Sequence, residues 1–234
     1  MKHTIKWLGE EEGSITFYED EKEVLEFRFF VISEEEAELK LVKLQNIEAI
    51  QQKEEIPKEL LHTVTNGIRE AFWLLWEEGL EETVLAEPKG TNVWKLLCGT
   101  DAVENSYSEY MMQRLVSMGE FGSKDTNSLC LREEAEGLVC ENSEKSFFCR
   151  LLPYQDVSEH TKGYYLYEVE VAKEQRNQGI ATDCLKALFA KLTEKNSVML
   201  YLQVGSYNLP ALHLYEKLGF KVQEELCYYA AAEE

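Results

Sequence analysis

The fold of the second half of the chain is decided by one stretch, Val169-Glu170-Val171-Ala172-Lys173-Glu174-Gln175-Arg176-Asn177-Gln178-Gly179-Ile180-Ala181-Thr182. It begins like a strand, and after Gly179 the apolar residues recur at every fourth position, which predicts a helix over residues 179–195. The first N–H groups of a helix have no helical acceptor and carry partial positive charge, so they bind phosphate. Gly179 allows close approach of the backbone, small Ala181 avoids a clash, and Arg176 adds a charged contact. By itself this pattern is better explained as an ordinary strand-to-helix turn, and it predicts an anion-binding turn only together with the segment at residues 208–220.

A second stretch follows an apolar run at residues 198–204, which is typical of a buried strand. It reads Asn208-Leu209-Pro210-Ala211-Leu212-His213-Leu214-Tyr215-Glu216-Lys217-Leu218-Gly219-Phe220. Asn208 suits a helix cap, Pro210 suits the first turn, and Gly219 suits the end. Asn208 and Tyr215 are seven residues apart, so two helical turns place them on one face. By itself this segment is equally well explained by a capping asparagine and a packing tyrosine.

Together the two stretches resemble the GNAT superfamily of N-acetyltransferases. Residues 164–182 look like its fourth strand and its pyrophosphate loop, whose usual pattern is Q/R-x-x-G-x-G/A. Residues 198–220 look like its fifth strand and its N-x-x-A-x-x-L-Y-x-K-x-G-F helix. The resemblance covers residues 128–234, and it implies an α/β fold with a mixed, mostly antiparallel sheet flanked by helices. The early helices that usually shape the acceptor site of this family have no obvious counterpart in these residues.

The resemblance also implies a cofactor, acetyl-CoA, and a role for each matching residue. The main-chain groups of Val169 and Val171 would pair with the pantetheine arm, and Asn208 would contact the cofactor. Tyr215 would be the general acid that protonates the leaving thiolate, while the separation of the two central strands would expose an N–H group to the thioester carbonyl. The pyrophosphate would be held by Gln175, Arg176, Asn177, Gln178, Gly179, Ile180, Ala181 and Thr182.

The general base is left between two carboxylates. Glu168 and Glu170 are two residues apart on one predicted strand, so they share a face and either could take a proton directly or through water. Tyr164, Tyr165 and Tyr167 either frame the acceptor or are ordinary sheet residues. We interpret His213 as a solvated helix residue and not as a catalyst.

The two halves of the chain resemble each other. Strand and turn patterns recur in the same order with a slowly changing offset, from 137 − 13 = 124 to 208 − 92 = 116. This predicts two tandem copies of one fold, with a domain at residues 1–118, a linker at 119–127 and an acetyltransferase domain at 128–234.

The first copy lacks the cofactor loop. At the corresponding place it reads Lys53-Glu54-Glu55-Ile56-Pro57-Lys58-Glu59, which has no glycine and carries three glutamates, and a glycine at position 99 replaces the tyrosine. Residues 1–118 are therefore interpreted as a degenerate copy that has lost cofactor binding. It either completes the sheet or covers the acceptor pocket.

Composition limits the partners. The net charge of −20 argues against a nucleic-acid partner and is compatible with a cationic substrate, although it can also serve solubility alone. No long apolar segment or signal peptide is present, which predicts no membrane partner and a cytoplasmic location. The six cysteines form no CxxC pair, so no metal site is expected. The leading hypothesis is acetyl transfer to a primary amine of a small molecule or peptide by a monomer or homodimer; transfer of a longer acyl group, or a non-catalytic acyl-CoA sensor, stays open.

Overall fold

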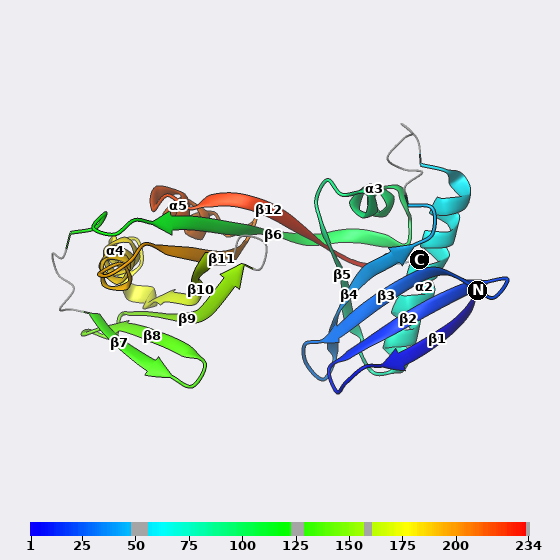
Figure 1. Cartoon of the computed structure of the whole chain (residues 1–234), viewed down its shortest axis with the longest axis horizontal. Helices are drawn as coiled ribbons and strands as arrows, with labels where there is room; N and C mark the ends of the chain where they lie inside the picture. The colour runs from blue at the N-terminus through cyan, green and yellow to red at the C-terminus, as the bar shows by residue number, and fades with distance from the viewer. Residues whose placement is uncertain (48–55, 123–128, 157–160, 233–234) are drawn as a thin grey trace. The chain divides into compact units, whose positions relative to one another are not determined.

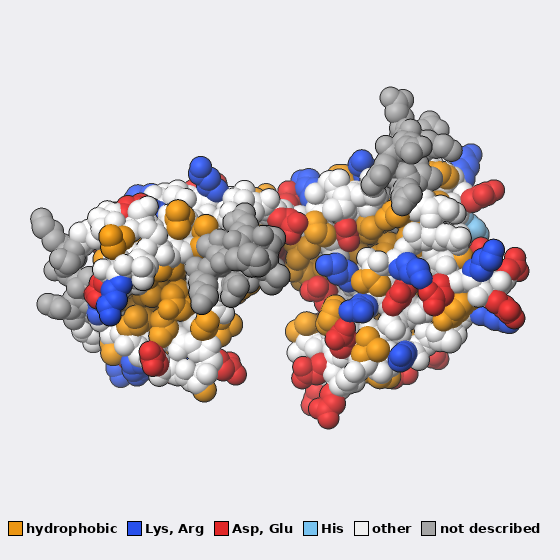
Figure 2. All heavy atoms as spheres, viewed as in Figure 1, with side chains coloured by type: hydrophobic (Ala, Val, Ile, Leu, Met, Phe, Trp, Pro, Cys, Tyr) orange, Lys and Arg blue, Asp and Glu red, His pale blue; other side chains and the backbone are white. Residues whose placement is uncertain are grey.

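The chain folds into two compact units (Figure 1). The structure is a computed structural model that describes residues 1–47, 56–122, 129–156 and 161–232. Met1–Ser108 and Glu225–Glu234 make up the first unit, and Glu109–Glu224 make up the second. In Figure 2 the acidic side chains are scattered over the visible face and interspersed with Lys and Arg.

The first series of elements supplies most of the first unit. It comprises β1 (Lys2–Trp7), β2 (Glu12–Glu19), β3 (Lys22–Val31), β4 (Glu36–Leu44), α2 (Lys58–Glu77), β5 (Glu82–Pro88), α3 (Asn92–Gly99) and β6 (Val103–Val116). Neighbouring strands are antiparallel except β4 and β5, which are parallel. The predicted apolar face of α2 packs into the core, where Val64, Ile68 and Leu75 are fully buried.

The second series has the same order of elements. It comprises β7 (Leu129–Glu134), β8 (Gly137–Asn142), β9 (Phe147–Asp156), β10 (Thr161–Val171), the short 3-10 helix η2 (Lys173–Gln175), α4 (Ile180–Leu192), β11 (Val198–Gly205), α5 (Leu209–Lys217) and β12 (Lys221–Ala231). The parallel pair is here β10 and β11. Apart from η2, the described residues of each series form four strands, a helix, a strand, a helix and a strand. The predicted mixed, mostly antiparallel sheet with flanking helices in two copies is confirmed.

The last strand of each series pairs with the other series. Residues 109–116 of β6 pair with β11 in the second unit, and residues 226–229 of β12 pair with β5 in the first unit. The units therefore do not divide at the predicted positions 118 and 128, because a strand joins the sheet edge that satisfies its hydrogen bonds whatever its place in the sequence. Residues 123–127 of the predicted linker and residues 53–55 of the first copy's loop lie outside the described residues.

The core of the second unit lies on one face of its sheet. Leu166 on β10 and Leu200 and Leu202 on β11 point to this face and pack against α4, whose Leu185, Leu188 and Phe189 are fully buried. The alternate residues of these strands, which are not part of this core, face the other side of the sheet. Among the residues that the structure describes, no helix combines the length and apolar character needed to cross a membrane.

Candidate functional site

The turn between β10 and α4 has the backbone that the sequence predicts for an anion site. Gly179 precedes α4 with φ +84°, and its lack of a side chain leaves the helix without a side-chain cap. The N–H of Asp183 donates to the carbonyl of Gly179 at 3.0 Å, which is the usual first bond of a helix. The N–H groups of Ile180, Ala181 and Thr182 precede that bond and have no helical acceptor. They are available to an anion.

Side chains of the turn hold its shape. The Arg176 Nε donates to the Val171 carbonyl at 3.0 Å, and the Gln178 amide donates to the Glu174 carbonyl at 3.2 Å. The Gln175 side-chain oxygen is buried and has no hydrogen-bond partner within the described structure. A buried acceptor without a donor is costly, so this atom suits a ligand that brings an N–H or O–H group.

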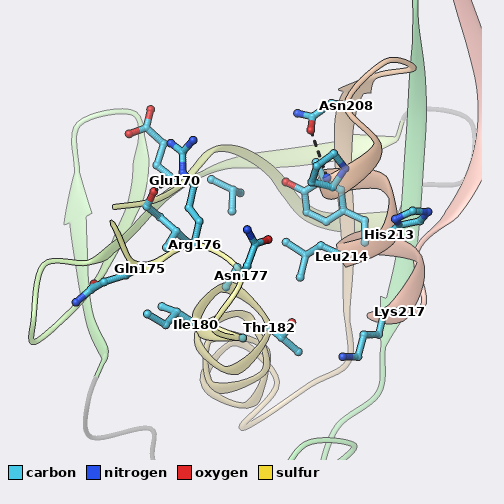
Figure 3. Close-up of a pocket in the computed structure, with 17 residues that line it drawn as sticks. Glu170, Gln175, Arg176, Asn177, Ile180, Thr182, Asn208, His213, Leu214 and Lys217 are labelled. Carbon is cyan, nitrogen blue, oxygen red and sulfur yellow. Dashed lines mark hydrogen bonds between the residues drawn. The ribbon is translucent and has the colours of Figure 1, made fainter. Parts of the chain in front are cut away.

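Helix α5 forms the opposite wall (Figure 3). The Asn208 Oδ1 accepts a hydrogen bond from the Ala211 N–H at 3.3 Å, which confirms the predicted cap. From the same helix His213, Leu214 and Lys217 line a cavity, across which Arg176 and Asn177 project from the turn. The cavity volume is about 680 Å³, which is within the range of cofactor sites.

Tyr215 is the buried acidic group of this cavity. It is 7% exposed and its ring packs edge-on against Phe220 with centroids 5.7 Å apart. Burial raises the pKa of its phenol to about 12, and Cys149 and Tyr165 add to the rise. The phenol therefore keeps its proton near neutral pH and can donate it.

The two predicted base carboxylates are separated by a β-bulge. Between Tyr167 and Glu170 the pairing of β10 with β9 shifts by one residue, and Glu168 takes φ +49°. The strict alternation that would give Glu168 and Glu170 a common face is interrupted there, so the predicted common face of these two carboxylates is wrong. The Glu168 carboxylate accepts from the Arg150 Nε at 2.8 Å and does not line the cavity, whereas Glu170 does.

Strands β10 and β11 separate beside the cavity. Their parallel pairing covers only Gly163–Tyr165 and Met199–Tyr201, although both strands continue. At Gly163 the backbones are so close that a Cβ atom would lie 1.9 Å from the Met199 carbonyl oxygen. Beyond Tyr165 the β11 side of β10 is no longer paired with β11, so backbone groups of β10 open toward the cavity.

Most of the residues predicted from the sequence line this one cavity. Among the predicted cofactor-binding residues Gln178 is missing from its lining, and Glu168 is missing among the predicted catalytic ones. The lining residues to which the sequence analysis gave no role in the site are Pro210, Ala211, His213, Leu214 and Lys217. All belong to α5, and helical periodicity around Tyr215 would have indicated Ala211 at i−4.

Comparison with known proteins agrees with this geometry. Residues 112–220 match the family model described as acetyltransferase (GNAT) family. The chain is similar to the mycothiol acetyltransferase of Corynebacterium aurimucosum, with 34% identity over 68 residues that cover 29% of this chain and 22% of that protein. It is also similar to the N-alpha-acetyltransferase of Saccharolobus solfataricus, with 39% identity over 72 residues, 30% of this chain and 43% of that protein. The matches span less than half of either relative.

Two solved structures share the fold over most of the chain. The GCN5-related N-acetyltransferase from Sphaerobacter thermophilus superposes with a TM-score of 0.59 at 11% identity, covering 97% of this chain and 82% of that one. The GCN5-related N-acetyltransferase from Kribbella flavida gives a TM-score of 0.53 at 9% identity, covering 89% and 87%. Identity this low shows a common fold and no more.

Proposed function

Since residues 112–220 form a domain of the acetyltransferase (GNAT) family, we propose that the protein is an acetyl-CoA-dependent N-acetyltransferase that acts on a primary amine of a small molecule or peptide. One observation carries the proposal. The uncapped N-terminus of α4 and the buried phenol of Tyr215 line the same cavity. The first suits a diphosphate, and the second suits a leaving group that needs a proton.

The turn before α4 would hold the donor. The N–H groups of Ile180, Ala181 and Thr182 would bind its diphosphate, with added positive charge from Arg176 and Lys217. The backbone of Val169 and Val171 would pair with the pantetheine arm. When bound, acetyl-CoA supplies a thioester whose acetyl group passes to the amine nitrogen.

The chemical step then needs a proton acceptor and a proton donor. Glu170 lines the cavity and would take the proton of the acceptor ammonium, directly or through water. The Tyr215 hydroxyl would give its proton to the departing sulfur, since its raised pKa keeps it protonated. A backbone N–H of β10 beyond the paired segment would polarise the thioester carbonyl. The bond of Glu168 to Arg150 favours Glu170 as the base.

A coenzyme titration tests donor binding directly. In an NMR titration with CoA, we expect the amide signals of Ile180, Ala181 and Thr182 to shift and saturate. The matched control is the N-terminus of α3, where the Thr91 side chain already accepts from the Trp94 N–H at 2.9 Å, so the Trp94 amide signal should stay in place. Unmoved signals at α4 with saturating CoA would refute the assignment.

Turnover separates the enzyme from an acyl-CoA sensor. Thiol release from acetyl-CoA in the presence of a panel of primary amines supports acetyl transfer. Binding of CoA without thiol release from acetyl-CoA or longer acyl-CoAs, with any amine, would instead identify a sensor. The protonated phenol of Tyr215 in the cavity favours an acetyltransferase over a sensor, because acetyl transfer requires a proton donor and CoA binding alone does not.

A further inference from the structure

Five tyrosines lie on the face of the second unit's strands that is opposite the core of this unit. Strand register places Tyr165 beside Tyr201, Tyr167 two residues further along β10, and Tyr154 beside Gly163. These positions alternate with the core residues Leu166, Leu200 and Leu202. Tyr207 joins them, because a Cβ atom at Gly205 would lie 2.7 Å from its ring. We call Tyr154, Tyr165, Tyr167, Tyr201 and Tyr207 the tyrosine face.

Four rings of the tyrosine face, those of Tyr154, Tyr165, Tyr167 and Tyr201, form a chain of ring contacts. The Tyr154 ring centroid lies 4.4 Å from that of Tyr201 and 6.4 Å from that of Tyr165, and the Tyr165 and Tyr167 centroids are 6.3 Å apart. Tyr201 is 6% exposed, whereas Tyr154 and Tyr207 are 40% and 76% exposed. Tyr201 is therefore the buried base of the tyrosine face, and Tyr154 and Tyr207 are accessible to a ligand.

A carboxylate from the first series of elements lies on the same face. Glu109 is opposite Gly205 in the pairing of β6 with β11, which gives it the same side as Gln203 and Tyr201. Its Oε2 accepts a hydrogen bond from the Gln203 side-chain amide. Burial raises the pKa of Tyr165, and the negative charge of Glu109 adds to the rise, so the carboxylate acts electrostatically on this phenol.

The tyrosine face is connected to the reacting end of the cavity. Tyr165 and Tyr201 are the last paired residues before β10 and β11 separate, and Tyr165 also contributes to the raised pKa of Tyr215 on the core side. The register shift gives Glu170 the side of Tyr167, and Glu170 lines the cavity. A group held on the tyrosine face is therefore next to the opening between the strands.

The chemistry of this face selects a cation. The faces of aromatic rings carry partial negative charge and attract ammonium groups, and a carboxylate supplies the full counter-charge. Arg150, which register places beside Tyr167, is bonded to Glu134 at 3.2 Å and to Glu168 at 2.8 Å, so its charge is already balanced. An anionic acceptor would be repelled by the Glu109 carboxylate and by the partial negative charge of the ring faces. The charge of Arg150, which could offset this repulsion, is already paired.

We propose that the tyrosine face is the acceptor site and binds a primary ammonium group with an adjacent aromatic or apolar group, with Glu109 as its counter-charge. This inference rests on the proposed acetyl transfer. It also gives the first series a task in the second unit, because β6 delivers the carboxylate.

Binding of a matched pair of probes to the full chain tests the site. The pair is 2-phenylethylamine and 2-phenylethanol, which differ in the ammonium group, and affinity is measured by NMR through the tyrosine ring signals. We expect the amine to bind about tenfold or more tightly than the alcohol, because a hydrogen bond between an ammonium group and a carboxylate is roughly twice as strong as one between neutral groups. Glu109→Gln should remove this preference. Glu104→Gln, a change at an exposed carboxylate on the same strand, should keep it.

The outcomes separate this proposal from the proposed function. Equal affinity of the wild type for the amine and the alcohol overturns the acceptor site, and this comparison requires no variant to fold. An unchanged amine preference in Glu109→Gln also overturns it. CoA binding is measured in the same samples. If the wild type binds CoA but shows no preference for the amine, only the proposed acceptor site is overturned. If the wild type does not bind CoA, the proposed acetyl transfer is overturned.

Discussion

Tyr215→Phe is the most informative single change, because it removes a hydroxyl and keeps the buried ring. The phenol has a pKa of about 12, so near neutral pH only about one molecule in 10⁵ has lost the proton. In the proposed mechanism its task at that pH is to donate this proton. General acid catalysis contributes about 10²–10⁴-fold, so we expect kcat to fall by about that factor. The KM for acetyl-CoA should change by less than about threefold, because the ring that packs against Phe220 is retained.

The same substitution has a consequence for stability. The pKa of Tyr215 is about 12 in the folded chain and 10 as its ordinary value. The folded state therefore favours the protonated phenol. The resulting contribution of Tyr215 to the free energy of unfolding is fully present below pH 10 and is lost as the pH rises from 10 through 12. Two pKa units correspond to about 3 kcal/mol.

The assays are steady-state thiol release and urea denaturation as a function of pH. Wild type and Tyr215→Phe are compared up to about pH 11.5, so that shared effects of the other tyrosines cancel. We expect the wild type to lose more stability than the variant above pH 10. Tyr110→Phe is the matched control, since Tyr110 packs against the same core and does not line the cavity. Activity of Tyr215→Phe within about threefold of the control would refute the general-acid role, and equal alkaline slopes would refute the raised pKa.

Four further changes test the site and its support. Gly179→Ala puts an L-residue at φ +84° and should cost about 1–2 kcal/mol in urea denaturation; it should also raise the CoA Kd about tenfold in calorimetry, because the added methyl group obstructs the diphosphate. Lys217→Gln should weaken CoA binding severalfold at low salt and less at high salt, since it removes one exposed cation from the cavity wall; an effect independent of salt would contradict an ionic role. Gly163→Ala brings a Cβ atom to 1.9 Å from the Met199 oxygen and should lower stability by about 1–3 kcal/mol, while Gly122→Ala, with open space around it, serves as the control. Leu188→Ala, at a fully buried position of α4, should cost about 2–5 kcal/mol and lower the melting temperature; a loss below 1 kcal/mol would mean that α4 does not pack as described.

The local parts of the site could be predicted from the sequence because each depends on a few neighbouring residues. A glycine before an apolar helix leaves N–H groups uncapped, and Asn208 caps the next helix through its own side chain. The seven-residue spacing from Asn208 to Tyr215 needs only the period of a helix. The order of elements in the two series follows from the same kind of local pattern.

Other parts of the site depend on which strands meet. The bulge at Glu168 is a shift in the register between β10 and β9. The alternation of residues along β10 alone cannot predict it, because it depends on the pairing with β9. Lys217 enters the site because α5 packs across from the turn before α4. The tyrosine face combines residues of β9, β10, β11 and the turn after β11, and Glu109 of β6 lies on the same side of the sheet. The sequence separates these residues by up to 98 positions, from 109 to 207.

The sequence by itself determined the turn that leaves the N-terminus of α4 uncapped, the helix that carries Tyr215, and the repetition of the fold. These are short-range properties, because backbone geometry and capping act within one or two helical turns. Tertiary structure alone decided that the last strand of each series, β6 or β12, pairs with the other series. It also decided that Glu170 and not Glu168 lines the cavity, and that Glu109 of the first series lies on the same face as the tyrosines of the second. Strand pairing joins residues by hydrogen bonds between distant segments, and the choice of partner depends on the energy of the whole sheet.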